Sequence, residues 1–346
     1  MKTKLESIMR AAFELKASDI HLTVGISPML RINGELKKYS NTILHPEDTE
    51  QMARSILPQA MWDKFQERGE LDFSYGIQGV SRFRINTYKQ RSCVALAIRI
   101  IPTSIPTLQE LQLPEVLSAI SHKPQGLVLV TGPTGSGKST TLAAMIHYMN
   151  QSSRKHIITL EDPIEYLHKH GSCIIDQREV GFDTLNFANG LRAALRQDPD
   201  VILVGEMRDL ETVHTAITAA ETGHLVLGTL HTSSAPSTID RIIDVFPPNQ
   251  QAQVRIQLAS VLVSIISQRL FQTVDFKGRR AATEVLVNNP AIANLIRNEK
   301  IHQIHNILQT SRDQGMMTLE ASIKDLVQSG VILREIAEPF LQESIS

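Results

Sequence analysis

Residues 132–139 read Gly132-Pro133-Thr134-Gly135-Ser136-Gly137-Lys138-Ser139, which matches every defined position of the phosphate-binding loop pattern. The apolar run 126–130 precedes this segment and a helical pattern opens at Thr140, so strand, loop and helix follow in the order that the motif requires. The glycines let backbone N–H groups turn toward an anion, and the helix N-terminus adds the positive end of its dipole. We therefore expect residues 132–140 to bind a nucleotide, with Lys138 bridging its β- and γ-phosphates and the Ser139 hydroxyl binding Mg²⁺.

The segments around this loop predict a parallel sheet. Four short runs are almost entirely apolar, at 127–130, 157–160, 201–204 and 225–230, and helical patterns separate them. Strands this apolar are covered on both faces, which is typical of an α/β fold. Beyond Pro247-Pro248 the sequence predicts mostly helix, apart from a strand at 282–287.

The N-terminal third of the chain is predicted to form a smaller α+β unit. An amphipathic helix fits residues 4–16, with an apolar stripe of Leu5, Ile8, Met9, Ala12 and Leu15. The pair Asn33-Gly34 follows an apolar strand and tolerates the positive φ angles of a type I′ hairpin turn. Residues 46–67 are expected to be helical, and strands are expected at 18–24, 30–32, 71–75, 80–88 and 94–101.

Three prolines mark the boundary between these two parts. Pro102, Pro106 and Pro114 punctuate a polar stretch, and proline fixes φ and prevents a helix from continuing. We therefore expect a linker at 102–114. It separates an N-terminal domain at 1–101 from a phosphate-loop domain at 115–288, which is followed by a helical C-terminal region at 289–346.

The composition argues against several classes of protein. The 346 residues are 42% apolar and 21% charged, which is an ordinary globular balance rather than that of a disordered chain. Lys plus Arg number 35 and Asp plus Glu 36, whereas dedicated nucleic-acid binders are usually strongly basic, so we expect no direct nucleic-acid partner. No apolar run approaches the ~18 residues of a membrane helix, and no secretory signal pattern opens the sequence. Cys93 and Cys173 have no metal-ligand spacing and are expected to be reduced cytosolic thiols.

Acidic side chains follow two of the apolar runs. Glu206 comes after the run 201–204, with Gly205 at the position where an aspartate is usual. A carboxylate there holds Mg²⁺ through water or positions the attacking water. Glu161 directly follows the run 157–160, and Glu165 comes four positions later. Because ligands bind at the carboxyl ends of such strands, all three acids lie on the expected side, and spacing leaves both Glu161 and Glu165 as candidates for the general base.

Histidines and arginines complete the set of candidate site residues. His224 and His231 stand at opposite ends of one strand, up to about 23 Å apart, so they cannot both contact one γ-phosphate. His231 at the carboxyl end is the candidate phosphate sensor, and His224 is expected to contact another subunit or domain. Arg84 and Arg99 lie inside apolar strand patterns, where an arginine needs a counter-charge. They form either a solvated basic face or arginine fingers that reach a neighbour's γ-phosphate.

Taken together, these segments resemble the type IV pilus retraction ATPase (PilT) family of secretion-type hexameric motors. The resemblance covers nearly the whole chain. It rests on four segments in order, at 132–139, 158–166, 200–209 and 223–232, with support from 18–22 and 82–86. A phosphate loop alone is generic, but the series of four is highly specific.

The resemblance implies a fold and roles for individual residues. Members form a homohexameric ring in which each protomer joins a PAS-like N-terminal domain to a RecA-like domain, and ATP lies between protomers. By resemblance, Glu165 rather than Glu161 matches the catalytic glutamate, and Glu206 matches the Walker B acid. Arg84 and Arg99 match the arginines that reach across to the nucleotide, and the paired histidines match those of the family.

The resemblance also implies a place in the cell and partners. The family works in the cytoplasm at the inner membrane, against a pilus platform protein of that membrane, and a second retraction ATPase is a further candidate partner. Ala293 stands where the C-terminal motif of the family usually has an arginine. An accessory or orphan retraction paralogue is therefore an alternative. Pilus-assembly and type II secretion ATPases are another, although these usually carry a four-cysteine zinc module.

Two further readings remain, a nucleic-acid motor and a nucleotide-binding subunit that does not hydrolyse ATP. The near-zero net charge argues against the first, because binding to a phosphate backbone needs clustered cations. The presence of Lys138, Ser139, Glu165 and Glu206 argues against the second.

Overall fold

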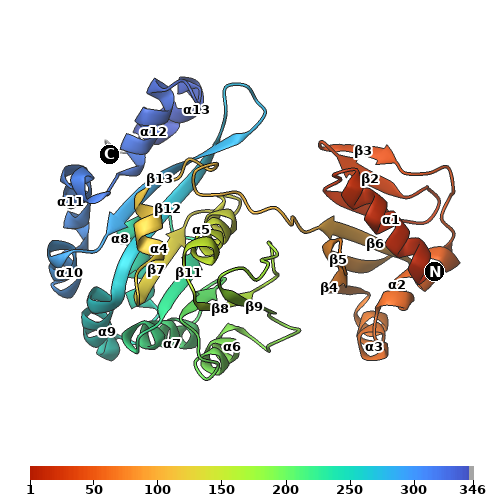
Figure 1. The fold of residues 1–346 in the computed structure, drawn as a ribbon, viewed down its shortest axis with the longest axis horizontal. Coiled ribbons are helices and arrows are strands. Elements are labelled where there is room, and N and C mark those ends of the chain that lie inside the picture. The colour runs from red at the N-terminus through yellow and green to blue at the C-terminus, as the bar shows by residue number, and fades with distance from the viewer. Residues whose placement is uncertain (343–346) are drawn as a thin grey trace. The chain divides into compact units, whose positions relative to one another are not determined.

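The computed structural model describes residues 1–342 and divides the chain into two compact units, Met1–Ser104 and a second unit that begins at Ile105. Each unit has its own sheet (Figure 1). The stretch predicted as a linker, 102–114, is divided between them. Leu108 is only 5% exposed and packs in the core of the second unit, with Leu111 and Leu113 against the same cluster. Because these leucines pack in that core, the segment between Pro106 and Pro114 belongs to the second unit, which begins at Ile105.

The first unit is a six-stranded antiparallel sheet with three helices, in the strand order β3-β2-β1-β6-β5-β4. Its strands are β1 (Asp19–Leu22), β2 (Met29–Ile32), β3 (Glu35–Lys38), β4 (Glu70–Ile77), β5 (Ser81–Gln90) and β6 (Cys93–Ile100). Its helices are α1 (Lys2–Glu14), α2 (Pro46–Ile56) and α3 (Gln59–Arg68). Side chains of β5 alternate between buried and half-buried positions along Ser81–Tyr88, as expected of a sheet with one face on the core.

Local sequence signals account for most of these elements. Asn33 and Gly34 have φ values of 53° and 85°, as the predicted type I′ turn between β2 and β3 requires. The helix predicted at 46–67 is interrupted at Leu57-Pro58, because proline cannot continue α2. Leu15 is 51% exposed rather than part of the predicted apolar stripe, since α1 ends at Glu14.

The second unit is a seven-stranded sheet in the order β13-β12-β7-β11-β10-β8-β9. Its strands are β7 (Gly126–Thr131), β8 (His156–Glu161), β9 (Ile174–Glu179), β10 (Val201–Val204), β11 (Leu225–Leu230), β12 (Leu262–Gln272) and β13 (Arg279–Val287). All neighbouring strands are parallel except β12 and β13, which form an antiparallel pair. The α/β fold with a parallel sheet is therefore as predicted.

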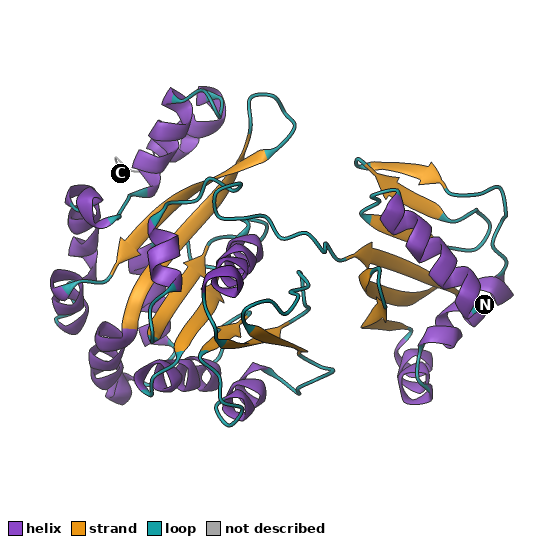
Figure 2. Cartoon of the chain, viewed as in Figure 1, coloured by secondary structure: helices purple, strands orange, loops and turns teal. Residues whose placement is uncertain are grey.

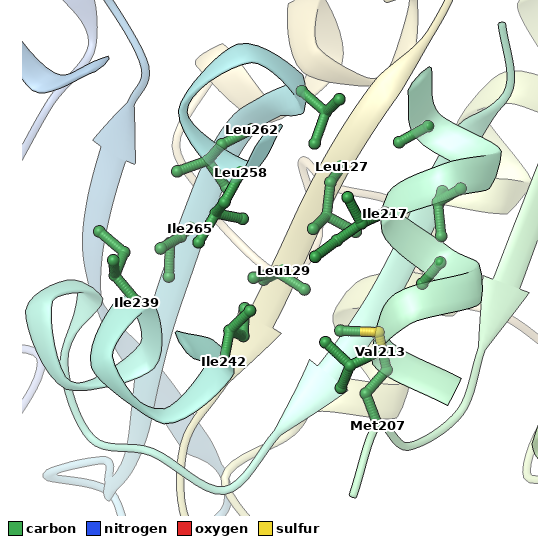
Figure 3. Close-up of a cluster of buried hydrophobic side chains, with 14 of the residues drawn as sticks. Leu127, Leu129, Met207, Val213, Ile217, Ile239, Ile242, Leu258, Leu262 and Ile265 are labelled. Atoms are coloured by element: carbon green, nitrogen blue, oxygen red, sulfur yellow. The ribbon is translucent and has the colours of Figure 1, made fainter. Parts of the chain in front are cut away.

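Helices cover both faces of this sheet (Figure 2). Leu127 and Leu129 of β7 pack in one apolar cluster with side chains of α7, α8 and α9, part of which Figure 3 shows. Val128 and Val130 of the same strand pack on the opposite side with α4 and α5. The helices are α4 (Val116–Ser121), α5 (Lys138–Ser152), α6 (Phe187–Ala194), α7 (Leu210–Glu221), α8 (Ala235–Asp244) and α9 (Pro248–Val261). Burial on both faces is the reason that the strands are apolar throughout.

The C-terminal part is helical, as predicted. It contains α10 (Pro290–Arg297), α11 (Ile304–Thr310), α12 (Leu319–Gln328) and α13 (Arg334–Gln342), with short 3₁₀ turns at Ile301–Gln303 and Arg312–Gln314. Ile323 and Ala337 of the last two helices pack against Phe271 and Ala282 of the β12–β13 hairpin. The end of the region predicted as helical, 343–346, lies outside the described residues.

Two strands differ from the sequence-based prediction. Residues 262–272 were expected to be helical and instead form β12, which pairs with β7 on one side and β13 on the other. Its mixture of apolar and polar residues does not distinguish a strand from a helix, and β7, one of its two pairing partners, lies far away in the sequence. β9 was not predicted, because its mixed residues give no clear period. Among residues 1–342, no helix is long and apolar enough to cross a membrane.

Candidate functional site

The phosphate-loop segment connects β7 to α5 at the carboxyl end of β7. Gly132, Gly135 and Gly137 have φ values of 139°, 78° and 90°, so three positions use conformations that L side chains rarely adopt. Gly132 also has no room for a side chain, because a Cβ there would lie 2.3 Å from the backbone oxygen of Gln268. The glycine spacing of the motif is thus a direct requirement of this backbone path.

Lys138 begins α5 and reaches back over the loop. Its Nζ donates hydrogen bonds to the backbone oxygens of Gly132, at 2.9 Å, and Pro133, at 3.1 Å. Desolvation of the half-buried ammonium lowers the pKa of Lys138, while the charges of Glu206 and Glu165 act in the opposite direction. The amine therefore lies within electrostatic reach of two of the three carboxylates predicted from the sequence, Glu206 and Glu165.

A cavity of about 360 Å³ opens beside this loop. The structure brings most of the predicted site residues to its wall: Thr134, Gly135, Gly137, Lys138, Ser139, Thr140, Glu161, Glu165, Glu206 and His231. Gly132, Pro133 and Ser136 belong to the loop but do not line the cavity, and Ser136 is only 3% exposed. Phe187 and Arg279 also line it, and no sequence pattern predicted either as a site residue.

Glu206 follows β10 and has two partners. Nε2 of His231 lies 2.8 Å from its Oε1, and the Arg208 guanidinium pairs with the same oxygen. Close packing explains why a glycine precedes Glu206, since a Cβ at Gly205 would lie 3.0 Å from the backbone oxygen of Leu160. Arg208 was missed by the sequence reasoning, although it stands only two positions after the acid.

The two candidate bases have different environments. Oε1 of Glu161 accepts hydrogen bonds from Thr159 Oγ1, at 2.6 Å, and Gln177 Nε2, at 3.0 Å, and its Oε2 accepts a long one from the Glu165 backbone N–H. Burial is the main cause that raises the pKa of Glu161. Glu165 is exposed and lines the cavity four positions further on. Of the two candidates, Glu165 is therefore the one whose carboxylate accepts no hydrogen bond from any residue of the described part of the chain, 1–342.

Gln177 of β9 holds the segment that carries these acids. Besides its bond to Glu161, its Nε2 donates to the Tyr166 backbone oxygen at 2.8 Å, and its Oε1 accepts from the His168 N–H at 2.8 Å. The Tyr166 hydroxyl in turn lies 2.9 Å from Thr140 Oγ1, in the first turn of α5. These contacts tie the acidic segment to the phosphate loop, and no signal in the sequence pointed to Gln177.

The two histidines lie where the strand pattern placed them. His231 follows β11 and lines the cavity, whereas His224 precedes the same strand and does not. The His224 ring Nδ1 lies 3.0 Å from the Ala219 backbone oxygen, at the end of α7. The structure thus brings one of the pair to the candidate site.

Arg84 and Arg99 belong to the first unit, where they are directly opposite each other on β5 and β6. Asp19 is opposite Arg99 on the other side, and its Oδ1 accepts a 3.0 Å hydrogen bond from Arg99 Nε. Because 66% of the Arg99 side chain is exposed, this ion pair lies at the surface, and burial does not require a counter-charge for Arg99 as its place in an apolar strand pattern had suggested.

Comparisons with known proteins identify relatives along almost the whole chain. The family model described as type II/IV secretion system protein matches residues 1–338. The type IV pilus retraction ATPase PilT of Pseudomonas aeruginosa is 49% identical over 328 residues, covering 94% of this chain and 95% of that protein. A twitching motility protein of Neisseria gonorrhoeae is 46% identical, over 96% of this chain and 90% of its own length.

A solved structure agrees with these sequence relatives. The crystal structure of the pilus retraction motor PilT with bound ADP is 52% identical and superposes with a TM-score of 0.89, over 96% of this chain and 95% of that one. The α/β fold described above is therefore the fold of that motor. By sequence and by structure, this chain belongs to the family of type II/IV secretion system proteins.

Proposed function

We propose that this protein is an ATP-hydrolysing motor that powers retraction of a type IV pilus. The observation that carries the proposal is the single cavity that Lys138, Glu165, Glu206 and His231 share beside a phosphate loop. The relatives named as retraction and twitching motility proteins, at 49% and 46% identity over nearly the whole chain, supply the biological process. In this proposal the first unit is a PAS-like domain, 1–101, and the second has a RecA-like core, 115–288, followed by the helical region 289–346.

The cavity suits a magnesium nucleotide. Mg²⁺ prefers oxygen ligands and keeps several waters, and the Ser139 hydroxyl and the Glu206 carboxylate both line the wall. These two residues would hold the ion, directly or through water, and the ion would neutralise charge on the β- and γ-phosphates. Lys138 would exchange its two backbone acceptors for phosphate oxygens. Residues 132–140 would supply the remaining phosphate contacts.

Glu165 is proposed to orient or deprotonate the attacking water, because its carboxylate is exposed to the cavity. Glu161 then has a structural role, since Thr159 and Gln177 both donate hydrogen bonds to its Oε1. His231, close to Glu206, would report the γ-phosphate to the rest of β11. His224, at the other end of that strand, would contact another subunit or domain.

The working form is proposed to be a homohexamer in the cytoplasm, at the inner membrane, that acts on a pilus platform protein. Arg84 and Arg99 of one protomer would complete the site of the next, where an arginine stabilises charge in the transition state. A second retraction ATPase is a further candidate partner. The accessory-paralogue alternative rests on Ala293, which is 8% exposed in α10 at the position where an arginine is usual.

The sharing of a site between protomers can be tested by mixing two inactive variants. Lys138→Ala and Arg84→Ala are each expected to lose ATP turnover while keeping the fold. In mixed rings, a protomer with intact Lys138 can stand beside one with intact Arg84, so turnover is expected to reappear. Mixtures that stay inactive, or a monomeric preparation as active per chain as the ring, would contradict the shared site.

The cellular role needs a different experiment. Deletion of the gene is expected to leave excess surface pili and abolish twitching motility, because fibres would be assembled but not withdrawn. Loss of surface pili would instead favour a pilus-assembly ATPase. Unchanged piliation and motility would favour an accessory paralogue.

A further inference from the structure

Strand β12 runs immediately behind the phosphate loop. It pairs in parallel with β7 through Ser267 opposite Thr131, and the hydroxyls of these two residues are 2.7 Å apart. Its next residue, Gln268, places its backbone oxygen against Gly132 so closely that a Cβ on that glycine would lie 2.3 Å away. The loop therefore begins in direct contact with β12.

The side chain of Gln268 makes two buried hydrogen bonds to this region. Its Nε2 donates to the Ser136 backbone oxygen at 2.7 Å, and its Oε1 accepts from Thr141 Oγ1 at 2.9 Å. Gln268, Ser136 and Thr141 are only 3%, 3% and 2% exposed. One amide thus connects the middle of the phosphate loop to the first turn of α5.

The bond to Ser136 fixes the direction of a peptide group. In a trans peptide the C=O and the N–H point in opposite directions. When the Ser136 oxygen points toward Gln268, the Gly137 N–H points away from that side chain. Gly137 lines the cavity and begins the anion-binding end of α5, where such N–H groups serve as phosphate ligands.

We propose that Gln268 is a positioning residue that keeps the phosphate loop in the shape that binds phosphate. It does not contact the nucleotide, and acts by orienting the Ser136–Gly137 peptide and anchoring Thr141. Glutamine suits this position because its amide is at once a donor for a carbonyl and an acceptor for a hydroxyl. The inference rests on the proposed nucleotide site, and it adds a residue from a strand that sequence patterns did not predict.

The test compares ADP binding by three forms of the full-length protein, with calorimetric titration as the measurement. Gln268→Glu keeps the size of the side chain and can still accept from Thr141, but its carboxylate cannot donate to the Ser136 oxygen. Gln272→Glu introduces the same change at the exposed end of the same strand and is the matched control. We expect Gln268→Glu to weaken ADP binding roughly ten-fold, the size of one lost hydrogen bond to a buried group, and Gln272→Glu to leave it unchanged.

Two further measurements separate positioning from a general loss of stability. The KM for ATP is expected to rise about as much as the ADP affinity falls, with kcat within about three-fold of the unaltered protein, because the reacting groups remain. Thr141→Val removes only the second contact, so a smaller loss of ADP affinity is expected. Combined with Gln268→Glu, it should add less than its separate effect, because the two residues act through one amide.

The outcomes distinguish this inference from the proposed function. Equal ADP affinity in Gln268→Glu and the unaltered protein would overturn the inference, as would a lower unfolding temperature without loss of affinity. If Gln268→Glu does not fold, wild-type affinity in Thr141→Val would overturn it. ADP binding without ATP turnover in the unaltered protein would overturn only the motor function, and absence of ADP binding would overturn both.

Discussion

Replacing Glu161 and Glu165 separately by alanine should have opposite effects: one change should lower mainly the free energy of unfolding, and the other mainly the rate of ATP turnover. Glu161→Ala leaves Thr159 Oγ1 and one Gln177 N–H without their acceptor. Each deprived donor costs about 1–3 kcal/mol, so we expect the free energy of unfolding to fall by about 2–4 kcal/mol, because Gln177 keeps its bond to the Tyr166 oxygen. Glu165 is exposed, so Glu165→Ala should change that free energy by less than about 0.5 kcal/mol.

The effect on turnover is expected to be the reverse. Loss of a general base lowers a rate by about 10²–10⁴-fold, which we expect for the single-turnover release of phosphate by Glu165→Ala. Glu161→Ala retains Glu165 and should keep at least about a tenth of the rate. Urea unfolding at fixed protein concentration and single-turnover phosphate release, measured on both variants, provide the comparison. A stable but inactive Glu161→Ala together with an active Glu165→Ala would refute the reasoning and make Glu161 the base.

Three other predictions concern the loop, a buried histidine and the core. Gly132→Ala should abolish ADP binding, because the added Cβ meets the Gln268 oxygen at 2.3 Å; binding at the original affinity would contradict the assigned loop path. Burial lowers the pKa of His168 from 6.5 to about 4, so the unfolded chain takes up the proton first and the free energy of unfolding should fall by up to about 3 kcal/mol as pH drops from 6.5 toward 4. Urea titrations at several pH values should show this slope reduced in His168→Phe, and an identical slope would exclude this cause. Leu129→Ala should lower the free energy of unfolding, measured in urea, by about 2–5 kcal/mol, since this β7 side chain is fully buried against the helices. A decrease below about 1 kcal/mol would mean that water reaches this position.

Much of the second unit could be predicted from short segments of sequence. The glycines of the phosphate loop predict positive φ angles, which the structure shows. The apolar runs predict strands covered on both faces, and these strands are covered in this way. Because parallel strands end at the same edge of a sheet, the positions of Glu206 and His231 after their strands were enough to bring both to the cavity of Lys138. Each of these signals is local, since it depends on the conformation of a few consecutive residues.

The environment of each acid depended on contacts between distant parts of the chain. Spacing alone does not distinguish Glu161 from Glu165 as the general base. The difference comes from hydrogen bonds to Glu161, and one of their donors, Gln177, belongs to a strand that the sequence pattern does not predict. β12 is a strand where the sequence predicts helix, because its mixture of apolar and polar residues fits either element until its pairing partners are known. Gln268 lies 132 positions from the carbonyl that it holds. A hydrogen bond across such a separation leaves no periodic trace in either segment, so only the folded arrangement of the strands could place these groups together.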